Sequence, residues 1–248
     1  KKRGISEFSI EKFEIGYAPI SADTINFLKS NHYNLTDAID LGIIDTGTNG
    51  LYSRFIERIT FPIYSISAKL VGFGGRTITG HNAKYVNSPQ TKLFNKSKLL
   101  YGYQIAKEHI YKKNQIIVCE GYLDVIMLHQ AGFNTAVATL GTALTADHLP
   151  LLRRGEPKVI LAYDGDKAGL AAAFKASVML SQSEFEGGVI IFADGMDPAD
   201  MVNKNKVEEL NEIFENPISF TPYAIDYIIS KYDINDANQK QKALHESN

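Results

Sequence analysis

Hydrophobic and polar positions are arranged in two different ways along the chain, and the change falls near residue 113. After it, short apolar runs alternate with stretches in which apolar residues recur at helical spacing. The pattern predicts strands at residues 116–119, 135–139, 158–163 and 189–192, with helices at 122–131, 147–154 and 167–181 between them. Strands that alternate with helices indicate right-handed βαβ units and a mostly parallel sheet covered on both faces.

The regions on either side of this alternation have a different texture. Residues 1–113 are irregular and rich in Gly and Tyr, with candidate strands at 13–17, 58–62 and 69–74 and candidate helices at 21–29 and 36–41. Beyond residue 200 the strand signal disappears, and residues 207–214 and 219–232 have helical patterns. We therefore predict an α/β protein in three parts. They are an α+β subdomain (1–113), a mostly parallel sheet flanked by helices (114–203) and a small helical subdomain (204–248).

Composition limits the class of protein. The 248 residues are 44% hydrophobic and 22% charged, which is ordinary for a globular protein. Because Cys119 is the only cysteine, neither a disulfide framework nor a Cys-rich zinc site can form within the chain, and we expect a reducing, cytoplasmic location. No apolar run approaches the roughly 20 residues of a membrane helix, so we expect no membrane partner. The chain begins at Lys1, which suggests a piece of a longer protein.

Charge is distributed unequally behind a net charge of −2. Residues 1–113 contain 16 Lys and Arg against 9 Asp and Glu, a balance of +7, whereas residues 114–248 contain 10 against 19, a balance of −9. A basic half suits a phosphate backbone, and an acidic half suits divalent metal ions. The alternative is that both halves are simply solvated surfaces.

Acidic residues follow three of the predicted strands at their carboxyl ends. They are Glu120, then Asp164 and Asp166, then Asp194 and Asp197. In an open parallel sheet this edge is where ligands bind. Asp124 lies one helical turn beyond Glu120, so its carboxylate can face the same crevice.

Converging carboxylates repel one another, so a cation must compensate for their charge. Mg²⁺ or Mn²⁺ prefers oxygen ligands, and two such ions about 4 Å apart can stabilise both the attacking and the leaving oxygen of a phosphoryl displacement. The alternative is that each acid is a turn residue or a helix N-cap. The predicted ligand set for two ions is Glu120, Asp124, Asp164, Asp166 and Asp197.

The amino-acid sequences around these acidic residues resemble those of a known family. The segments EGYLD (120–124), YDGDKAG (163–169) and DGMDP (194–198) occur in this order, and residues 116–202 resemble the TOPRIM fold shared by DnaG-type primases and topoisomerases. The segment LGTALT (140–145) is similar to the primase version. The resemblance implies that Glu120, Asp164 and Asp166 are the principal metal ligands and catalytic residues, with Asp124 and Asp197 in the remaining acidic positions.

One position departs from the family pattern. The third motif usually reads Asp-Pro-Asp, whereas this chain has Asp197, Pro198, Ala199 and then Asp200. The second aspartate is thus displaced by one residue. Either Asp200 takes over its role, or the second metal depends on Asp194 or on water.

The basic half has a candidate nucleic-acid surface. Between Arg76 and Lys113 there are seven lysines and one acid, Glu108, with four tyrosines interleaved. Lysines contact phosphates and tyrosines stack on unpaired bases, although a lysine-rich surface can also be merely solvated. Residues 54–63, 72–76 and 84–89 resemble the amino-terminal signature of primases, which topoisomerases lack. The resemblance implies a basic ridge that binds template and nucleotides. Its matching positions are Lys12, Arg76, Lys84, Tyr85, Asn87 and Lys96.

The resemblance implies DNA-directed synthesis of short RNA primers on single-stranded DNA at the replication fork, by two-metal transfer from NTPs with release of pyrophosphate. Primases of this type also carry a zinc-binding domain and a helicase-binding domain. Neither is evident here, so we expect no zinc in this chain and contact with the replicative helicase only through regions absent from it. Three alternatives stay open: a TOPRIM nuclease or topoisomerase-like strand cleaver, an aspartyl-phosphate phosphatase, and a non-catalytic single-strand-binding replisome module.

Overall fold

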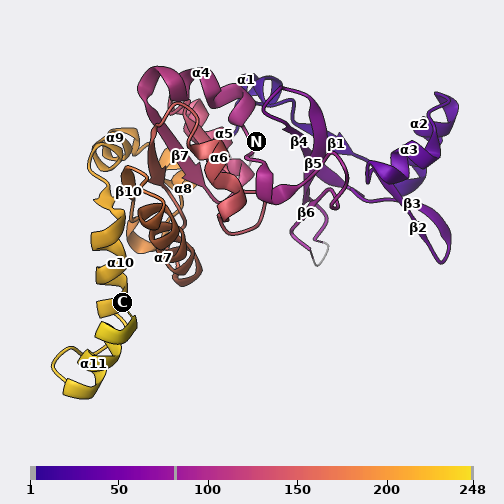
Figure 1. Cartoon of the computed structure of the whole chain (residues 1–248). Helices are drawn as coiled ribbons and strands as arrows, with labels where there is room; N and C mark the ends of the chain where they lie inside the picture. The colour runs from indigo at the N-terminus through magenta and orange to yellow at the C-terminus, as the bar shows by residue number, and fades with distance from the viewer. Residues whose placement is uncertain (1–3, 81–82, 247–248) are drawn as a thin grey trace.

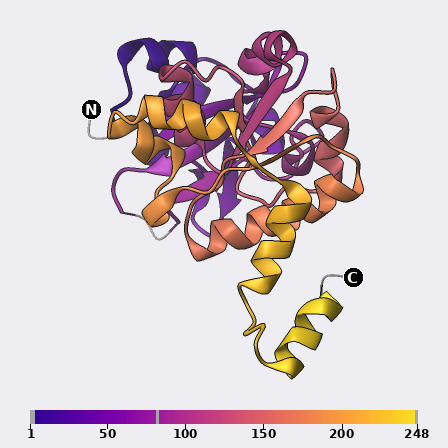
Figure 2. The same ribbon diagram turned by 90° about the vertical axis from the view of Figure 1, so that its left-hand side faces the viewer.

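The computed structural model describes residues 4–80 and 83–246. Figure 1 shows an elongated molecule with a small lobe at one end and a helix-covered sheet in the other half. Helices α10 (Phe220–Ile229) and α11 (Ala237–Glu246) extend from that half, as the turned view in Figure 2 also shows. No helix within the two described ranges is long and apolar enough to cross a membrane.

The larger sheet has five strands in the order β11-β10-β9-β7-β8. They are β7 (Gln115–Cys119), β8 (Ala136–Ala138), β9 (Lys158–Leu161), β10 (Gly187–Val189) and β11 (Ile218–Ser219). All neighbouring pairs are parallel except the edge pair of β10 and β11. The prediction of a mostly parallel sheet is therefore confirmed.

Helices cover both faces of this sheet, and β7 shows why. Its side chains alternate, so Ile117 and Cys119 belong to one buried cluster while Ile116 and Val118 belong to another. The first cluster includes residues of α5 (Tyr122–Gln130), α8 (Pro198–Asn203) and α9 (Val207–Glu215). The second includes residues of α4 (Tyr103–Lys113), α6 (Leu149–Leu152), α7 (Lys167–Gln182) and α10. Each fully buried aliphatic side chain contributes roughly 1.5–3 kcal/mol to folding.

The amino-terminal part is built on an antiparallel sheet in the order β1-β4-β5-β6. Its strands are β1 (Gly16–Ala18), β4 (Arg58–Tyr64), β5 (Leu70–Thr77) and β6 (Tyr85–Asn87), and α1 (Glu7–Lys12) precedes them. Glycine is required at the centre of β5, since a Cβ on Gly74 would collide with the ring of Tyr122 on α5. The small sheet thus packs closely against the start of a helix of the large one.

The lobe at the end of the molecule has a small core of its own. It contains α2 (Ser21–Ser30), α3 (Leu35–Asp40) and a hairpin of β2 (Ile44–Gly47) and β3 (Gly50–Ser53). Leu28, Ala38 and Ile44 are buried together there. With this lobe, the amino-terminal part is α+β in content, as predicted.

Two elements differ from the sequence-based expectation, and each has a physical cause. The fourth strand was predicted at 189–192 but runs from Gly187 to Val189. A Cβ on Gly187 would collide with the backbone of β9, and a Cβ on Gly188 with that of β11, so the strand depends on residues that give no apolar signal. The predicted strand at 13–17 overlaps β1 only at residues 16 and 17, because the segment before it forms α1, capped by the Ser6 side chain.

Further helices were not predicted. In α4, the buried residues Tyr103, Ala106 and Ile110 have helical spacing, but lysines and polar residues surround them in the sequence. Helix α11 and the short α8 were also missed, and the predicted helix at 147–154 is a short 3₁₀ turn (Ala146–His148) that continues into α6.

Candidate active site

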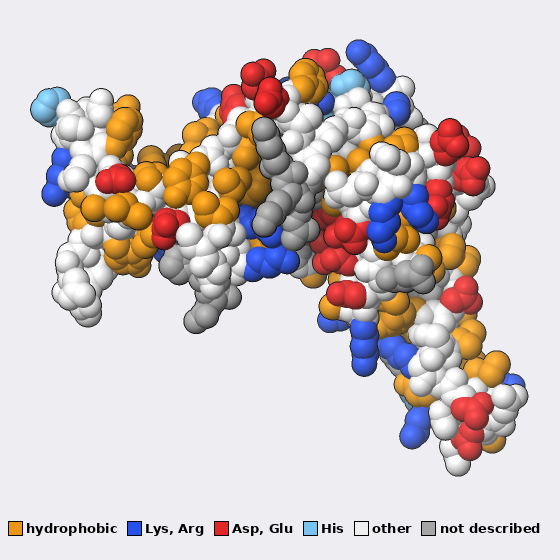
Figure 3. Space-filling model, turned by 180° about the vertical axis from the view of Figure 1, so that it is seen from behind, with side chains coloured by type: hydrophobic (Ala, Val, Ile, Leu, Met, Phe, Trp, Pro, Cys, Tyr) orange, Lys and Arg blue, Asp and Glu red, His pale blue; other side chains and the backbone are white. Residues whose placement is uncertain are grey.

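A cleft lies where the carboxyl edge of the large sheet faces the small antiparallel sheet. It has a volume of about 290 Å³. Its lining includes Glu120, Asp124, Asp164 and Asp197 from the large sheet and Lys84 and Tyr85 from the small one. Figure 3 shows acidic and basic side chains gathered near one another in the middle of this face of the molecule. Residues more than 100 positions apart in the sequence thus form one site.

Glu120 follows β7 directly and is half-buried. Burial, followed by the charge of Asp164 and a smaller effect of Asp166, raises the pKa of Glu120 to about 7, against a partly offsetting backbone hydrogen bond. Its Oε1 is buried without a hydrogen-bond partner among the described residues. The protein itself therefore compensates the ionised carboxylate only in part, through one backbone hydrogen bond.

Asp164 and Asp124 are in the same electrostatic situation. Burial raises the pKa of Asp164 to about 6, and the charges of Asp197, Asp166 and Asp200 add to the shift while Lys84 opposes it. Asp124 is buried in the first turn of α5, where it accepts a hydrogen bond from the backbone N–H of Gly121 at 3.2 Å. Burial, together with the charges of Asp197 and Asp164, raises the pKa of Asp124. The acids thus lie close enough to destabilise one another's ionised forms.

Asp166 and Asp197 begin helices. Oδ1 of Asp166 accepts from the backbone N–H groups of Ala168 at 2.9 Å and Gly169 at 2.8 Å, at the start of α7. Oδ1 of Asp197 accepts from the N–H of Asp200 at 2.6 Å, at the start of α8. The N-cap interpretation is therefore correct for both residues. It is compatible with metal ligation, because a carboxylate has two oxygens and about four acceptor sites.

The donor set suits a hard divalent cation. It consists of carboxylates alone, three of them with raised pKa values and one with a buried, unpartnered oxygen. Within the described part of the chain, however, no three His, Cys, Asp or Glu side chains already form a metal-binding group. Glu120, Asp124, Asp164 and Asp197 line the cleft without being arranged as a finished coordination sphere. Asp166 is exposed and is not among the lining residues, although its charge acts on Glu120 and Asp164.

The altered third motif lies at the same place. Ala199 lines the cleft, at the position where the family pattern has an aspartate. Asp200 is not among the lining residues, yet its charge contributes to the raised pKa of Asp164. The side chain of Asp194 lies outside the described part of the structure.

Three of the predicted binding residues gather on the basic side. Arg76 on β5 lies opposite Tyr85 on β6 in the strand register, with its guanidinium carbon 5.8 Å from the centre of the tyrosine ring. Nζ of Lys84 lies 6.0 Å from the same centre. Lys84 and Tyr85 also line the cleft next to the acids, whereas Arg76 is not a lining residue and lies beside the ring of Tyr85.

Asn87 joins the two sides of the site. Its Oδ1 accepts a hydrogen bond from the hydroxyl of Tyr122 at 2.5 Å, and its Nδ2 donates to the carbonyl of Leu140 at 2.8 Å. The Tyr122 ring stacks on Phe61 of β4 with ring centres 4.9 Å apart. Tyr122 is part of the first motif, but nothing in the sequence signals this linking role.

Lys12 and Lys96 do not line the cleft. Nζ of Lys12 lies 3.1 Å from Oδ1 of Asn134 and 3.3 Å from Nδ1 of His129, and burial lowers its pKa. His129 is near the end of α5, a helix about 13 Å long that begins at the acids. Lys96 is exposed in a short 3₁₀ turn, where its carbonyl oxygen lies 3.2 Å from Nε2 of His148. Nucleic-acid binding by these two lysines stays a prediction.

Two family models match the chain. The model described as "DNA primase catalytic core, N-terminal domain" matches residues 1–107, and the model described as "Toprim domain" matches residues 114–191. The first covers the basic side of the cleft and the second contains Glu120, Asp124, Asp164 and Asp166.

Among curated proteins, a DNA primase of Helicobacter pylori (strain J99) is 50% identical over 249 residues, covering 99% of this chain and 44% of the relative. A DNA primase of Campylobacter jejuni is 49% identical over 245 residues, covering 98% of this chain and 40% of the relative. The chain thus spans less than half the length of these relatives.

Among solved structures, the RNA polymerase domain of Mycobacterium tuberculosis primase DnaG is 32% identical with a TM-score of 0.87, covering 98% of this chain and 81% of that chain. A DnaG primase catalytic domain bound to ssDNA is 35% identical with a TM-score of 0.86, covering 97% and 77% of the two chains.

Proposed function

The chain belongs to the family of DnaG-type DNA primases, and from this premise we propose that it is a catalytic core that synthesises short RNA primers on single-stranded DNA during replication. The observation that carries the proposal is the cleft in which four carboxylates face Lys84 and Tyr85. The acidic side supports phosphoryl transfer, and the basic side supports a nucleic-acid substrate.

We assign the acidic side to two divalent ions, Mg²⁺ or Mn²⁺. Glu120, Asp164 and Asp166 would be the principal ligands, with Asp124 and Asp197 completing the set. When bound, the ions would neutralise charge on the triphosphate and lower the pKa of the attacking 3′-hydroxyl. The raised pKa values of Glu120 and Asp164 support this assignment, because a cation removes the repulsion that causes part of each shift.

We assign the basic side to phosphates and unpaired bases. Lys84 supports a phosphate contact, since its charge already acts on Asp164 across the cleft. Tyr85 offers a partly exposed ring for stacking, and Arg76 lies beside it. Asn87 would hold the two sides at a fixed separation through Tyr122 and Leu140 instead of contacting the substrate. We keep Lys96 as a peripheral template contact, and we propose that Lys12, whose ammonium group contacts His129 and Asn134, does not contact the template.

We propose that Asp200 substitutes for the acid that Ala199 replaces. Its charge reaches Asp164, and it lies in the first turn of a short helix whose N-cap is Asp197. The change Asp200→Ala should then weaken Mn²⁺ binding and lower primer synthesis about tenfold, as expected for a residue that supports a metal site. Unchanged Mn²⁺ affinity, measured by calorimetry, would exclude Asp200 as a substitute ligand.

The remaining proposals concern the location of the enzyme, its substrates and its domain boundaries. We propose that it acts in the cytoplasm at the replication fork, with NTPs and template as substrates. The zinc-binding domain and the contact with the replicative helicase would belong to regions outside this chain. We also keep the division at residues 113 and 203 as the proposed subdomain boundaries.

The test uses single-stranded DNA, labelled NTPs and Mg²⁺ or Mn²⁺. Short RNA products that are lost in Asp164→Ala and kept in Asp226→Ala, an exposed carboxylate on α10, would support the proposal. DNA fragments instead of RNA would indicate a nuclease. Binding of single-stranded DNA without any product would indicate a binding module.

A further inference from the structure

A second cavity lies beside the first at the carboxyl edge of the large sheet. It has a volume of about 340 Å³ and shares Glu120 with the first cavity. Thr139 follows β8, Glu120 follows β7 and Tyr163 follows β9, so three adjacent strands lead into it. The rest of its lining is small: Gly141, Thr142, Ala143 and Ala172. Apart from Glu120, its lining residues belong neither to the proposed metal site nor to the basic side.

Three polar atoms on residues that line this cavity are buried without a hydrogen-bond partner in the described structure. They are the hydroxyl oxygens of Tyr163 and Thr142 and Oε1 of Glu120. Tyr163 is only 3% exposed. Glu120 is assigned to the metal ions, so the hydroxyls of Tyr163 and Thr142 are the two groups that remain without a partner. Since the great majority of buried polar groups in proteins are hydrogen-bonded, these two exceptions beside one cavity indicate a ligand or water that supplies the partners.

The chemistry of the lining selects the ligand class. Two hydroxyls can each donate or accept, the carboxylate of Glu120 accepts, and no lysine or arginine is found among the described lining residues. A phosphate group would meet an uncompensated carboxylate, whereas a sugar would meet hydrogen-bond partners for its hydroxyls and the small side chains of Ala143 and Ala172 for its ring. The volume lies at the lower end of the range for small-ligand sites.

The position of the cavity identifies the sugar. In a nucleoside triphosphate the ribose is joined directly to the α-phosphate, and the phosphates belong in the first cavity next to Lys84 and the acids. The hydrogen bond from Asn87 to the Leu140 carbonyl connects the basic side to the start of the loop that contains Thr142.

We propose that this second cavity is a ribose pocket in which the hydroxyls of Tyr163 and Thr142 bind the 2′-hydroxyl of the nucleotide, so that the enzyme favours NTPs over dNTPs. The inference rests on the proposed function and adds to it the residues that select the sugar. A site built to bond a hydroxyl discriminates against the analogue that lacks it, because its own polar groups are then left unpaired.

The experiment compares ATP with 2′-deoxyATP as substrates for primer synthesis with Mg²⁺. In Tyr163→Phe and in Thr142→Val, the ratio of kcat/KM for the two nucleotides should fall about tenfold, the worth of one hydrogen bond. Tyr101→Phe is the matched control. Its hydroxyl is also buried and unpartnered among the described residues, but Tyr101 belongs to the other core cluster and is not among the residues that line the cavity. This variant should keep the wild-type ratio.

Three outcomes would overturn the ribose pocket: no preference for ATP in the wild type, an unchanged ratio in both cavity variants, or an equal loss for both nucleotides. Failure of the proposed function can be recognised separately, because the wild type would then make no RNA at all. In that case the affinities for ATP and 2′-deoxyATP, measured with Mg²⁺ by calorimetry, decide. A preference for ATP that Tyr163→Phe removes supports the pocket, and equal affinities in the wild type overturn it.

Discussion

The two sides of the cleft are built in different ways. On the acidic side, carboxylates come from the ends of parallel strands and from the helices that follow them, so the topology of the sheet gathers them at one edge. On the basic side, Arg76 and Tyr85 meet through the register of an antiparallel pair. The first arrangement follows from chain order alone, whereas the second depends on pairing that the hydrophobic pattern does not reveal.

The electrostatics of the two sides differ as well. Glu120, Asp124 and Asp164 all have raised pKa values, with burial as the largest cause and mutual repulsion next. Lys84 is exposed and acts on Asp164 from across the cleft. The acidic side is therefore costly to maintain without a cation, whereas Lys84 on the basic side remains exposed to water. We therefore expect primer synthesis to depend most on the acidic side, where the carboxylates repel one another.

The largest expected effect is the loss of a principal metal ligand. We expect Glu120→Gln and Asp164→Asn to lower primer synthesis by roughly 10²–10³-fold, since a bound metal ion supplies several kcal/mol of transition-state stabilisation. The same variants should unfold at higher temperature than the wild type in the absence of metal, because each removes a repelled charge. Asp226→Asn, on an exposed part of α10, should change neither quantity. Full activity in both site variants would show that the acids are structural.

The next effect concerns Asn87, which connects the two sides. Asn87→Ala leaves the buried hydroxyl of Tyr122 without its partner and frees the Leu140 carbonyl, so the free energy of unfolding should fall by about 1–3 kcal/mol. Primer synthesis should fall with it, through a higher KM. Adding Tyr122→Phe to Asn87→Ala should cost less than the sum of the two single changes. Additive losses would mean that the two residues act independently.

Much of the acidic side could be predicted from the sequence, for a physical reason. Glu120 and Asp164 follow apolar runs whose burial fixes the strand ends, so their convergence needs only the parallel sheet. The fourth strand was misplaced because Gly187 and Gly188 are required by close backbone packing and not by hydrophobicity. Consequently Asp197 does not follow that strand directly and owes its position to the start of α8.

Much of the basic side could not be predicted. Helix α4 lies in the lysine-rich segment and was not predicted, because only three of its residues are buried and they form a weak apolar stripe. The resemblance grouped Lys12 with Lys84, but the side chain of Lys12 contacts the end of α5 instead of the cleft. Charge marks a surface in the sequence without stating where its side chains point, so tertiary packing decides which cations face the substrate.

A smaller effect is expected in the pH dependence of stability, which the acidic side should dominate. In the metal-free protein, the pKa values of Glu120 and Asp164 lie at about 7 and about 6, above their model-compound values of 4.5 and 3.8. The folded state therefore binds more protons than the unfolded state between about pH 4 and pH 7, and its stability should fall as pH rises through this window. Allowing for solvent exposure, the loss is about 1–2 kcal/mol. Thermal unfolding with chelator should show the decrease, and saturating Mg²⁺ or Glu120→Gln should reduce it.

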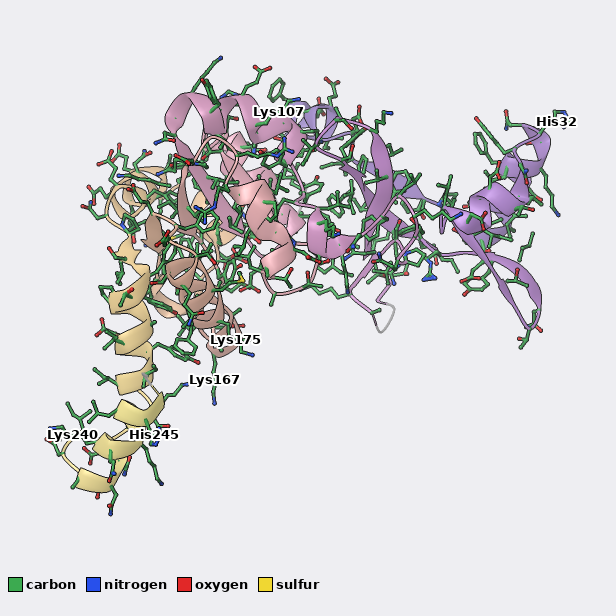
Figure 4. The ribbon with its side chains drawn as sticks, viewed as in Figure 1. His32, Lys107, Lys167, Lys175, Lys240 and His245 are labelled. Carbon is green, nitrogen blue, oxygen red and sulfur yellow. The ribbon has the colours of Figure 1, made fainter. Side chains whose placement is uncertain are left out.

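The smallest expected effect separates the basic residues from one another. Each phosphate contact on single-stranded DNA contributes about 0.7 to the slope of log affinity against log salt, so Lys84→Ala should reduce that slope by nearly one unit. Lys240→Ala, on α11 far from the cleft (Figure 4), serves as the matched control and should leave the slope unchanged. Lys12→Ala should behave like the control, because the ammonium group of Lys12 is held by Asn134 at the distant end of α5. A reduced slope for Lys12→Ala would mean that template passes over that end of the helix, and the basic side would then extend well beyond the cleft.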